Sequence, residues 1–146
     1  MGLIDEIRRG AYVPSNARSE AVPGRSTSLA QSASGVSSGD GLLRVAREFL
    51  DQASRRSDSE LGELIGERPA TTGSDRGDAL LAGIAEHLAA TRGLPCPAWV
   101  LEPERFLDRF WFVSEVPGFR AIALAQAPMA LKRRGILWPA RSLERV

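Results

Sequence analysis

The sequence predicts an all-α fold, a small bundle of about five or six short helices behind a flexible N-terminal leader. Apolar residues recur at helical spacing from Leu42 onward. Capping residues, prolines and glycines mark where these stretches begin and end. No two alternating segments are joined by a hairpin signal. We therefore divide the chain into a leader, residues 1–41, and a helical domain, residues 42–146.

The leader is defined by its composition. Ser, Gly, Pro and Ala occupy 18 of the 28 positions in residues 14–41. Such a segment buries too little apolar surface to offset the entropy of ordering it, so we expect it to be disordered. Removing residues 1–41 should then leave the thermal midpoint almost unchanged. Leu3, Ile4 and Ile7 share one face of a possible short helix, which is either a docking peptide or a frayed start.

Two helices are predicted next. The first carries an apolar stripe with polar residues opposite, and Asp51 and Arg55 form a favourable i,i+4 pair. A second, shorter helix is predicted over Asp58–Gly66, with Leu61, Leu64 and Ile65 facing inward. The stripe of the first helix consists of Leu42, Ala46, Phe49, Leu50 and Ala53.

The strongest helical pattern covers Ser74–Arg92. Ser74 or Asp75 can cap its N-terminus, and Gly93 can end it. Pro95 and Pro97 then fix an extended loop.

Prolines start the remaining predicted elements. Pro103 opens a helix that carries an aromatic face, and Pro117 opens the next, which Pro128 ends or restarts one turn later. Residues 136–138 form a short extended run, and Pro139 starts a last turn. The helix from Pro103 holds Phe106, Leu107, Phe110 and Trp111; the next holds Phe119, Ile122, Ala123 and Met129; the last turn holds Leu143 and Val146.

Composition excludes several classes of protein. The 19 Lys plus Arg nearly balance the 18 Asp plus Glu, for a net charge of +1, which disfavours a strongly basic nucleic-acid binder. One Cys and one His can form neither a disulfide nor a zinc cage, and no cofactor is predicted. No long apolar run or secretory signal is present, so we expect a cytoplasmic protein that does not bind membranes.

No catalytic set is apparent. His87 has no nucleophile at a spacing that would make it a general base, and Cys96 lies between two prolines, where a packed thiol is the simpler interpretation. Paired carboxylates such as Asp75 and Asp78 are explained as helix N-terminal charges. The chain is therefore predicted not to be an enzyme.

Two groups of residues in the C-terminal half are candidate binding sites. Aromatic rings and arginines are the side chains that interface cores prefer, although the rings could instead build the domain core. The basic residues could form a patch for nucleic acid, in a segment, 102–146, whose net charge is +3. The candidate partner-binding residues are Trp99, Phe106, Phe110, Trp111, Phe112 and Trp138, and the candidate basic patch is Arg105, Arg109, Arg120, Lys132, Arg133 and Arg134.

The C-terminal half also resembles a known group of proteins. Residues 78–89, 93–99, 105–108, 111–112, 127–128, 133–136 and 143–146 look like an uncharacterised actinobacterial helical domain, similar to the C-terminal part of antitoxin-like and helix-turn-helix regulator proteins. Several such proteins carry a regulator module where this chain has its Ser/Gly-rich leader, so the resemblance implies protein interaction and not DNA binding.

These observations predict a non-enzymatic helical protein-interaction module. It is antitoxin-like or accessory to a neighbouring gene product, and its partner is another protein, such as a toxin-like or operon-encoded one. The alternative is a nucleic-acid-associated transcriptional regulator that uses the C-terminal basic patch.

Overall fold

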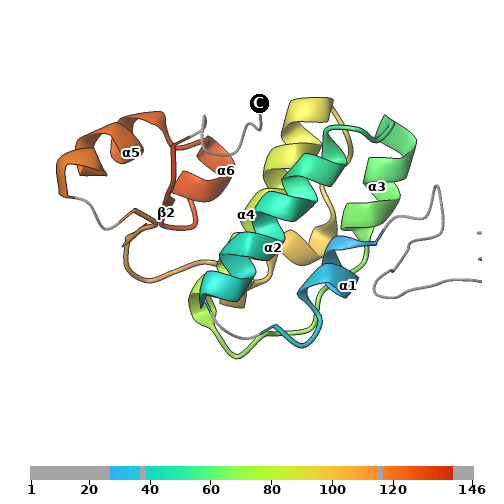
Figure 1. The fold of residues 1–146 in the computed structure, drawn as a ribbon, viewed down its shortest axis with the longest axis horizontal. Coiled ribbons are helices and arrows are strands. Elements are labelled where there is room, and N and C mark those ends of the chain that lie inside the picture. Colours follow the sequence, from blue (N-terminus) through green and yellow to red (C-terminus); the bar gives the residue numbers. More distant parts are fainter. Residues whose placement is uncertain (1–26, 37–38, 115–116, 140–146) are drawn as a thin grey trace, which may run out of the picture.

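The computed structural model describes residues 27–36, 39–114 and 117–139 (Figure 1). In this part of the chain six α-helices and one pair of two-residue strands are formed, which confirms the predicted all-α class. The possible helical face of Leu3, Ile4 and Ile7 and the last turn with Leu143 and Val146 lie outside the described residues.

Helix α4, Asp75–Arg92, is the centre of the bundle. Helix α2 (Gly39–Ala53), helix α3 (Asp58–Gly66) and helix α6 (Met129–Lys132) all pack against it. The 3-10 turns η2 (Ala98–Leu101) and η3 (Pro103–Arg105) cover it as well.

These contacts explain why α4 is buried along most of its length. Eleven of its residues are buried, and a Cβ at Gly83 would overlap the Leu131 side chain, so glycine lets α6 approach closely. The helix begins at the predicted Ser74 cap, whose side chain accepts a hydrogen bond from Gly77 N, and it ends at Gly93, which has a φ of 67°.

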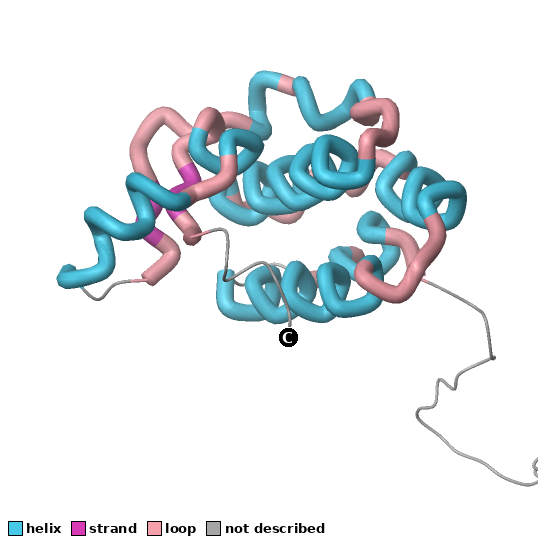
Figure 2. The backbone as a smooth tube through the Cα atoms, turned by 90° about the horizontal axis from the view of Figure 1, so that it is seen from above, coloured by secondary structure: helices cyan, strands magenta, loops and turns pink. Residues whose placement is uncertain are grey.

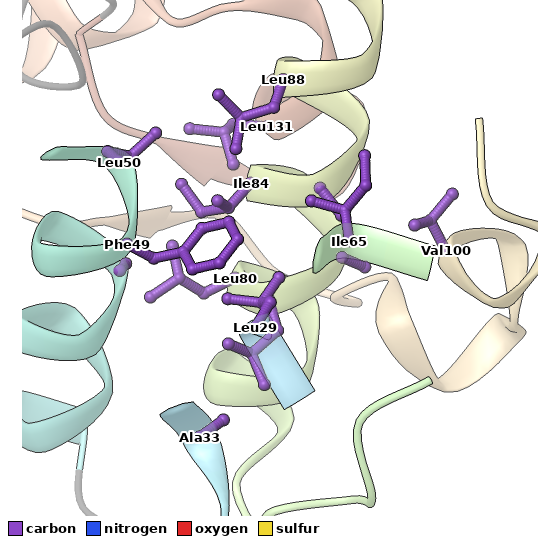
Figure 3. Close-up of a cluster of buried hydrophobic side chains, with 14 of the residues drawn as sticks. Leu29, Ala33, Phe49, Leu50, Ile65, Leu80, Ile84, Leu88, Val100 and Leu131 are labelled. Carbon is purple, nitrogen blue, oxygen red and sulfur yellow. The ribbon is translucent and has the colours of Figure 1, made fainter. Parts of the chain in front are cut away.

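The first two predicted helices are confirmed. All five residues of the predicted α2 stripe are buried, and α3 has the predicted bounds with Leu61, Leu64 and Ile65 inward. The Asp51–Arg55 ion pair is present at 3.6 Å. Figure 3 shows Phe49 from α2 directed at Leu80 and Ile84 of α4, so the amphipathic pattern of the sequence builds this core directly.

The predicted leader was too long at its C-terminal end. Helix α1, Leu29–Ala33, lies inside it, with a complete capping box between Ser28 and Gln31, and α2 already begins at Gly39. Leu29 and Ala33 are buried, and Leu29 lies in the same core as Phe49 and Leu80 (Figure 3). The composition argument missed this because one large apolar residue suffices to anchor a short capped helix.

Truncation and substitution of α1 should therefore destabilise the domain. We expect Leu29→Ala to lower the free energy of unfolding by about 2–5 kcal/mol, because it leaves a cavity in a packed core. Removal of residues 1–41 should lower the thermal midpoint, contrary to the sequence prediction. Urea denaturation measures the effect of the substitution and thermal denaturation that of the truncation, both followed by circular dichroism. Leu101→Ala, at a position 56% exposed, is the control and should cost less than about 0.5 kcal/mol.

The helix predicted from Pro103 is not formed. Helical geometry stops at Arg105, and Phe106 is extended with a φ of −122°. Further on, strand β1 (Trp111–Phe112) pairs in parallel with strand β2 (Ile136–Leu137). The extended backbone is fixed from outside the segment, since Leu107 N donates to Arg134 O and Trp111 N to Gly135 O. Tertiary pairing has overridden the helical spacing of the aromatic residues.

Helix α5, Arg120–Gln126, stands apart from the main bundle (Figures 1 and 2). It follows the 3-10 turn η4 (Pro117–Phe119) and packs chiefly against that turn and β2. As predicted, it ends before Pro128, and the chain restarts as α6 one residue later. Its sequence is apolar around most of its circumference, yet Ala123 is its one buried residue.

Candidate functional site

Arginine side chains cover the faces of most aromatic rings in the C-terminal half. Six such contacts occur among the described residues, where a protein of this size would have about one or two. Lysine cannot replace arginine in this geometry, because only the planar guanidinium stacks on a ring. The pairs, with the distance from Cζ to the ring centroid, are Arg134–Phe106 at 4.4 Å, Arg105–Trp99 at 4.8 Å, Arg120–Phe112 at 5.0 Å, Arg76–Trp111 at 5.3 Å, and Arg47–Trp138 and Arg133–Phe106 at 5.4 Å.

Arg105 is a buried structural clamp. Its side chain donates to the backbone carbonyls of Pro69, at 2.8 Å, and Asp78, at 3.4 Å. It also donates to Glu102 Oε1 at 3.1 Å, and its face lies over Trp99. One residue thus ties η3 to the α3–α4 loop and to the start of α4.

Arg134 forms the second clamp. Its guanidinium donates to Val100 O at 2.7 Å and to Arg105 O at 3.2 Å, and it pairs with the Glu86 carboxylate. Burial lowers the pKa of Arg134, and the hydrogen bond and charge of Glu86 act in the opposite direction. The clamp joins α4, η2 and η3 to the turn after α6.

The basic patch predicted from the sequence is broken up by these clamps. Arg105 and Arg134 are buried, and their donors are directed at carbonyls and carboxylates inside the domain. Arg133 pairs with Glu86 at 2.9 Å. Arg109, Arg120 and the half-buried Lys132 are left at the surface without a carboxylate partner among the described residues. The charge counted along the sequence did not show which cations are buried or paired in the folded domain.

The aromatic candidates also separate into two groups. Trp99, Trp111 and Trp138 are buried and belong to the core, so the folded chain does not present them to a partner. The indole N–H of Trp99 donates to Ile65 O at 3.0 Å. Phe106 and Phe112 are half-buried, and Phe110 is 65% exposed. Of the predicted partner surface, Phe110 alone is a largely exposed ring.

An apolar groove lies beside α5. Its volume is about 400 Å³, and Arg47 is the one charged side chain among the described residues of its wall. The half-exposed Phe119 lies at this groove, and Arg47 is stacked on the buried Trp138. We call this the α5 groove; its lining is Arg47, Val113, Ser114, Phe119, Ile122, Ala123, Trp138 and Pro139.

A second hollow lies at strand β1. Its volume is about 360 Å³, its wall contains two arginines and three aromatic residues, and none of the described residues that line it is a carboxylate. Arg76 covers Trp111 and Arg120 covers Phe112, while Phe110 projects into solvent. We call this the arginine–ring hollow; its lining is Arg76, Phe110, Trp111, Phe112, Ser114 and Arg120.

Sequence reasoning had not selected Arg47, Arg76 or Phe119 for binding. Arg47 lies in α2 and Arg76 in the first turn of α4. Their roles depend on rings more than 30 positions away in the chain, and no local spacing signals such a contact.

Of the two residues considered for catalysis, the structure characterises Cys96. Cys96 is exposed, and partial burial of its sulfur, together with the Glu86 carboxylate, raises the pKa of the thiol. A raised pKa leaves less thiolate at neutral pH and makes Cys96 a poorer nucleophile. Among the described residues no group of three or more His, Cys, Asp or Glu side chains is arranged to hold a metal ion.

One carboxylate gives the fold a defined pH dependence. Hydrogen bonds from Arg68, at 2.6 Å, and Arg105, at 3.1 Å, hold the pKa of Glu102 below its ordinary value of 4.5. A lowered folded-state pKa stabilises the fold above the unfolded value, and this contribution is lost as the pH falls through the folded value.

Glu102→Gln should therefore lower the thermal midpoint at neutral pH and flatten its decline below about pH 4.5. Thermal denaturation across the acid range measures this. Glu63→Gln, which removes the same charge from an exposed position on α3, is the control. Parallel pH profiles for the wild type and Glu102→Gln would contradict the assignment.

No protein-family model, curated protein or solved structure matches the chain. Within the described residues no helix is long and apolar enough to cross a bilayer. The candidate sites therefore rest on the geometry of the α5 groove and the arginine–ring hollow.

Proposed function

We propose that this chain is a cytoplasmic, non-enzymatic module that binds another protein through the α5 groove. The single observation that carries the proposal is the exposure of an apolar helix. Helix α5 and the turn before it leave Phe119, 52% exposed, and Leu124, 47% exposed, without cover in the described structure. Large apolar side chains exposed at a groove are characteristic of a protein-interaction site.

The groove also indicates the chemistry of the partner. Six of its eight lining residues are apolar, and its wall also carries Ser114 and Arg47, whose guanidinium lies over Trp138. An apolar segment that carries a carboxylate opposite Arg47 would complement it in shape and charge. This is consistent with the antitoxin-like or accessory role, with a toxin-like or operon-encoded protein as the partner.

A regulator that binds duplex DNA through the C-terminal basic residues has less support. Two of the six proposed contacts, Arg105 and Arg134, are buried, and a third, Arg133, is held in an ion pair with Glu86, which it shares with Arg134. Three remaining cations provide few of the phosphate contacts on which duplex affinity depends.

The test compares variants of the groove with matched variants outside it. The full chain is used to recover partners from native lysate, and any candidate is then purified and its binding measured by calorimetry. We expect Phe119→Ser and Arg47→Glu each to weaken binding at least tenfold. Leu101→Ser and Arg44→Glu repeat the same chemical changes at exposed positions outside the groove and should leave it unchanged.

Two outcomes would contradict the proposal. One is a partner set that is identical for the wild type and for Phe119→Ser. The other is a stable dimer of the purified chain, detected by light scattering, that Phe119→Ser dissociates. In that case the groove is covered by a second copy of this chain.

A further inference from the structure

We propose that the arginine–ring hollow binds single-stranded nucleic acid, with a base stacked on Phe110 and phosphates held by Arg76 and Arg120. This inference is independent of the proposed function, because Arg76 and Phe110 are not part of the α5 groove. It also differs from the basic patch predicted from the sequence, since Arg76 lies on α4, outside that patch.

The first support is the state of the two arginines. Each guanidinium has a ring against its face, Arg76 at 5.3 Å from the Trp111 centroid and Arg120 at 5.0 Å from that of Phe112. Stacking orients a guanidinium without consuming its N–H donors, which lie in its plane. Neither side chain makes a hydrogen bond or ion pair with another residue in the described part of the chain. Two oriented cations are thus available to anions.

The second support is the origin of the two cations. Arg76 lies in the first turn of α4 and Arg120 is the first residue of α5, and both line the hollow. Two cations carried by separate elements can each hold one phosphate of a strand.

The third support is the exposed ring. Phe110 is 65% exposed at the edge of the hollow, although the two residues after it are buried or half-buried. An aromatic face beside backbone-binding cations is the recurring arrangement for unpaired bases, because every base has a face that can stack. The volume of about 360 Å³ is sufficient for one nucleotide unit. A net charge of +1 does not oppose this, since a short strand needs few contacts.

Equilibrium dialysis of the full chain against radiolabelled hexathymidylate tests the inference. We expect saturable binding at about 50 mM salt that weakens about sevenfold at about 200 mM, the dependence for two phosphate contacts to a single strand. Arg76→Gln and Arg120→Gln should each reduce the affinity about tenfold, and Phe110→Ala should do the same. Arg44→Gln and Leu101→Ala, matched changes outside the hollow, should have no effect.

Several results would overturn the inference. The first is no binding at about 50 mM salt, and the second is an equal loss from Arg44→Gln and Arg76→Gln. An abasic hexamer that binds as tightly as hexathymidylate would show that no base stacks on Phe110. Thymidine monophosphate binding equally well would show that one nucleotide, not a strand, is the ligand. A phosphotyrosine peptide that binds where the hexamer does not would assign the hollow to a protein partner.

Discussion

Replacing Arg105 with alanine is expected to reduce the free energy of unfolding by about 3–5 kcal/mol, because it breaks a buried charged network. The side chain is 1% exposed and donates to Pro69 O, Asp78 O and Glu102 Oε1. Alanine would leave the Pro69 carbonyl without this donor and the Trp99 face uncovered. A domain of this size is stable by only about 5–15 kcal/mol, so a large part of its stability would be lost.

Urea denaturation followed by circular dichroism measures this loss. Arg105→Lys keeps the charge but changes the geometry of the donors. It should recover little of the lost free energy of unfolding, since an ammonium cannot serve several in-plane acceptors and stack on a ring at once. Arg109→Ala is the matched control at an exposed position and should cost less than about 0.5 kcal/mol. A loss below about 1 kcal/mol for Arg105→Ala would mean that the clamp does not support the fold.

Replacing Arg134 with alanine is the second large effect. We expect the free energy of unfolding to fall by about 3 kcal/mol, at the low end for loss of one partner of a buried pair, because the Glu86 carboxylate would keep its second partner, Arg133. The carbonyls of Val100 and Arg105 would lose this donor, and Phe106 would lose the nearer of the two guanidinium groups that contact its ring.

The neighbouring arginine provides the control for this prediction. Arg133→Ala removes a partner of the same carboxylate, but its side chain is 37% exposed, so the cost should be at most about 1 kcal/mol. If the two variants cost the same, burial does not determine the strength of the Glu86 network. Both are measured by the denaturation experiment used for Arg105.

Local patterns were sufficient to predict the helices of the bundle. The stripe from Leu42 to Ala53, the bounds Asp58–Gly66 and the stop at Gly93 depend on periodicity and capping, which are properties of neighbouring residues. Helix α1 was missed because Leu29 is anchored by a core assembled from α2 and α4. The segment at Trp111 was mispredicted for the same reason. Trp111 pairs with Ile136, 25 positions later, and this pairing makes the backbone extended although the aromatic residues have helical spacing.

The candidate sites were predicted only in part. The sequence shows that the C-terminal half is rich in aromatic residues and arginines, but it could not determine which of them are buried. Arg105 and Arg120 each stand next to a phenylalanine in the sequence, yet Arg105 is enclosed by the loop at Pro69 and Arg120 is exposed. The α5 groove and the arginine–ring hollow both combine residues from distant segments, so neither could be found by spacing.

The three tryptophans give the protein built-in optical reporters. Trp99 lies in the helical core, Trp111 at the arginine–ring hollow and Trp138 at the α5 groove, and a different arginine covers each indole. Indole emission responds to a nearby charge and to solvent. Three chains that each retain one tryptophan would therefore follow the core, the hollow and the groove separately and without an attached dye. A ligand that changes the emission of Trp111 but not that of Trp138 would be assigned to the arginine–ring hollow and not to the α5 groove.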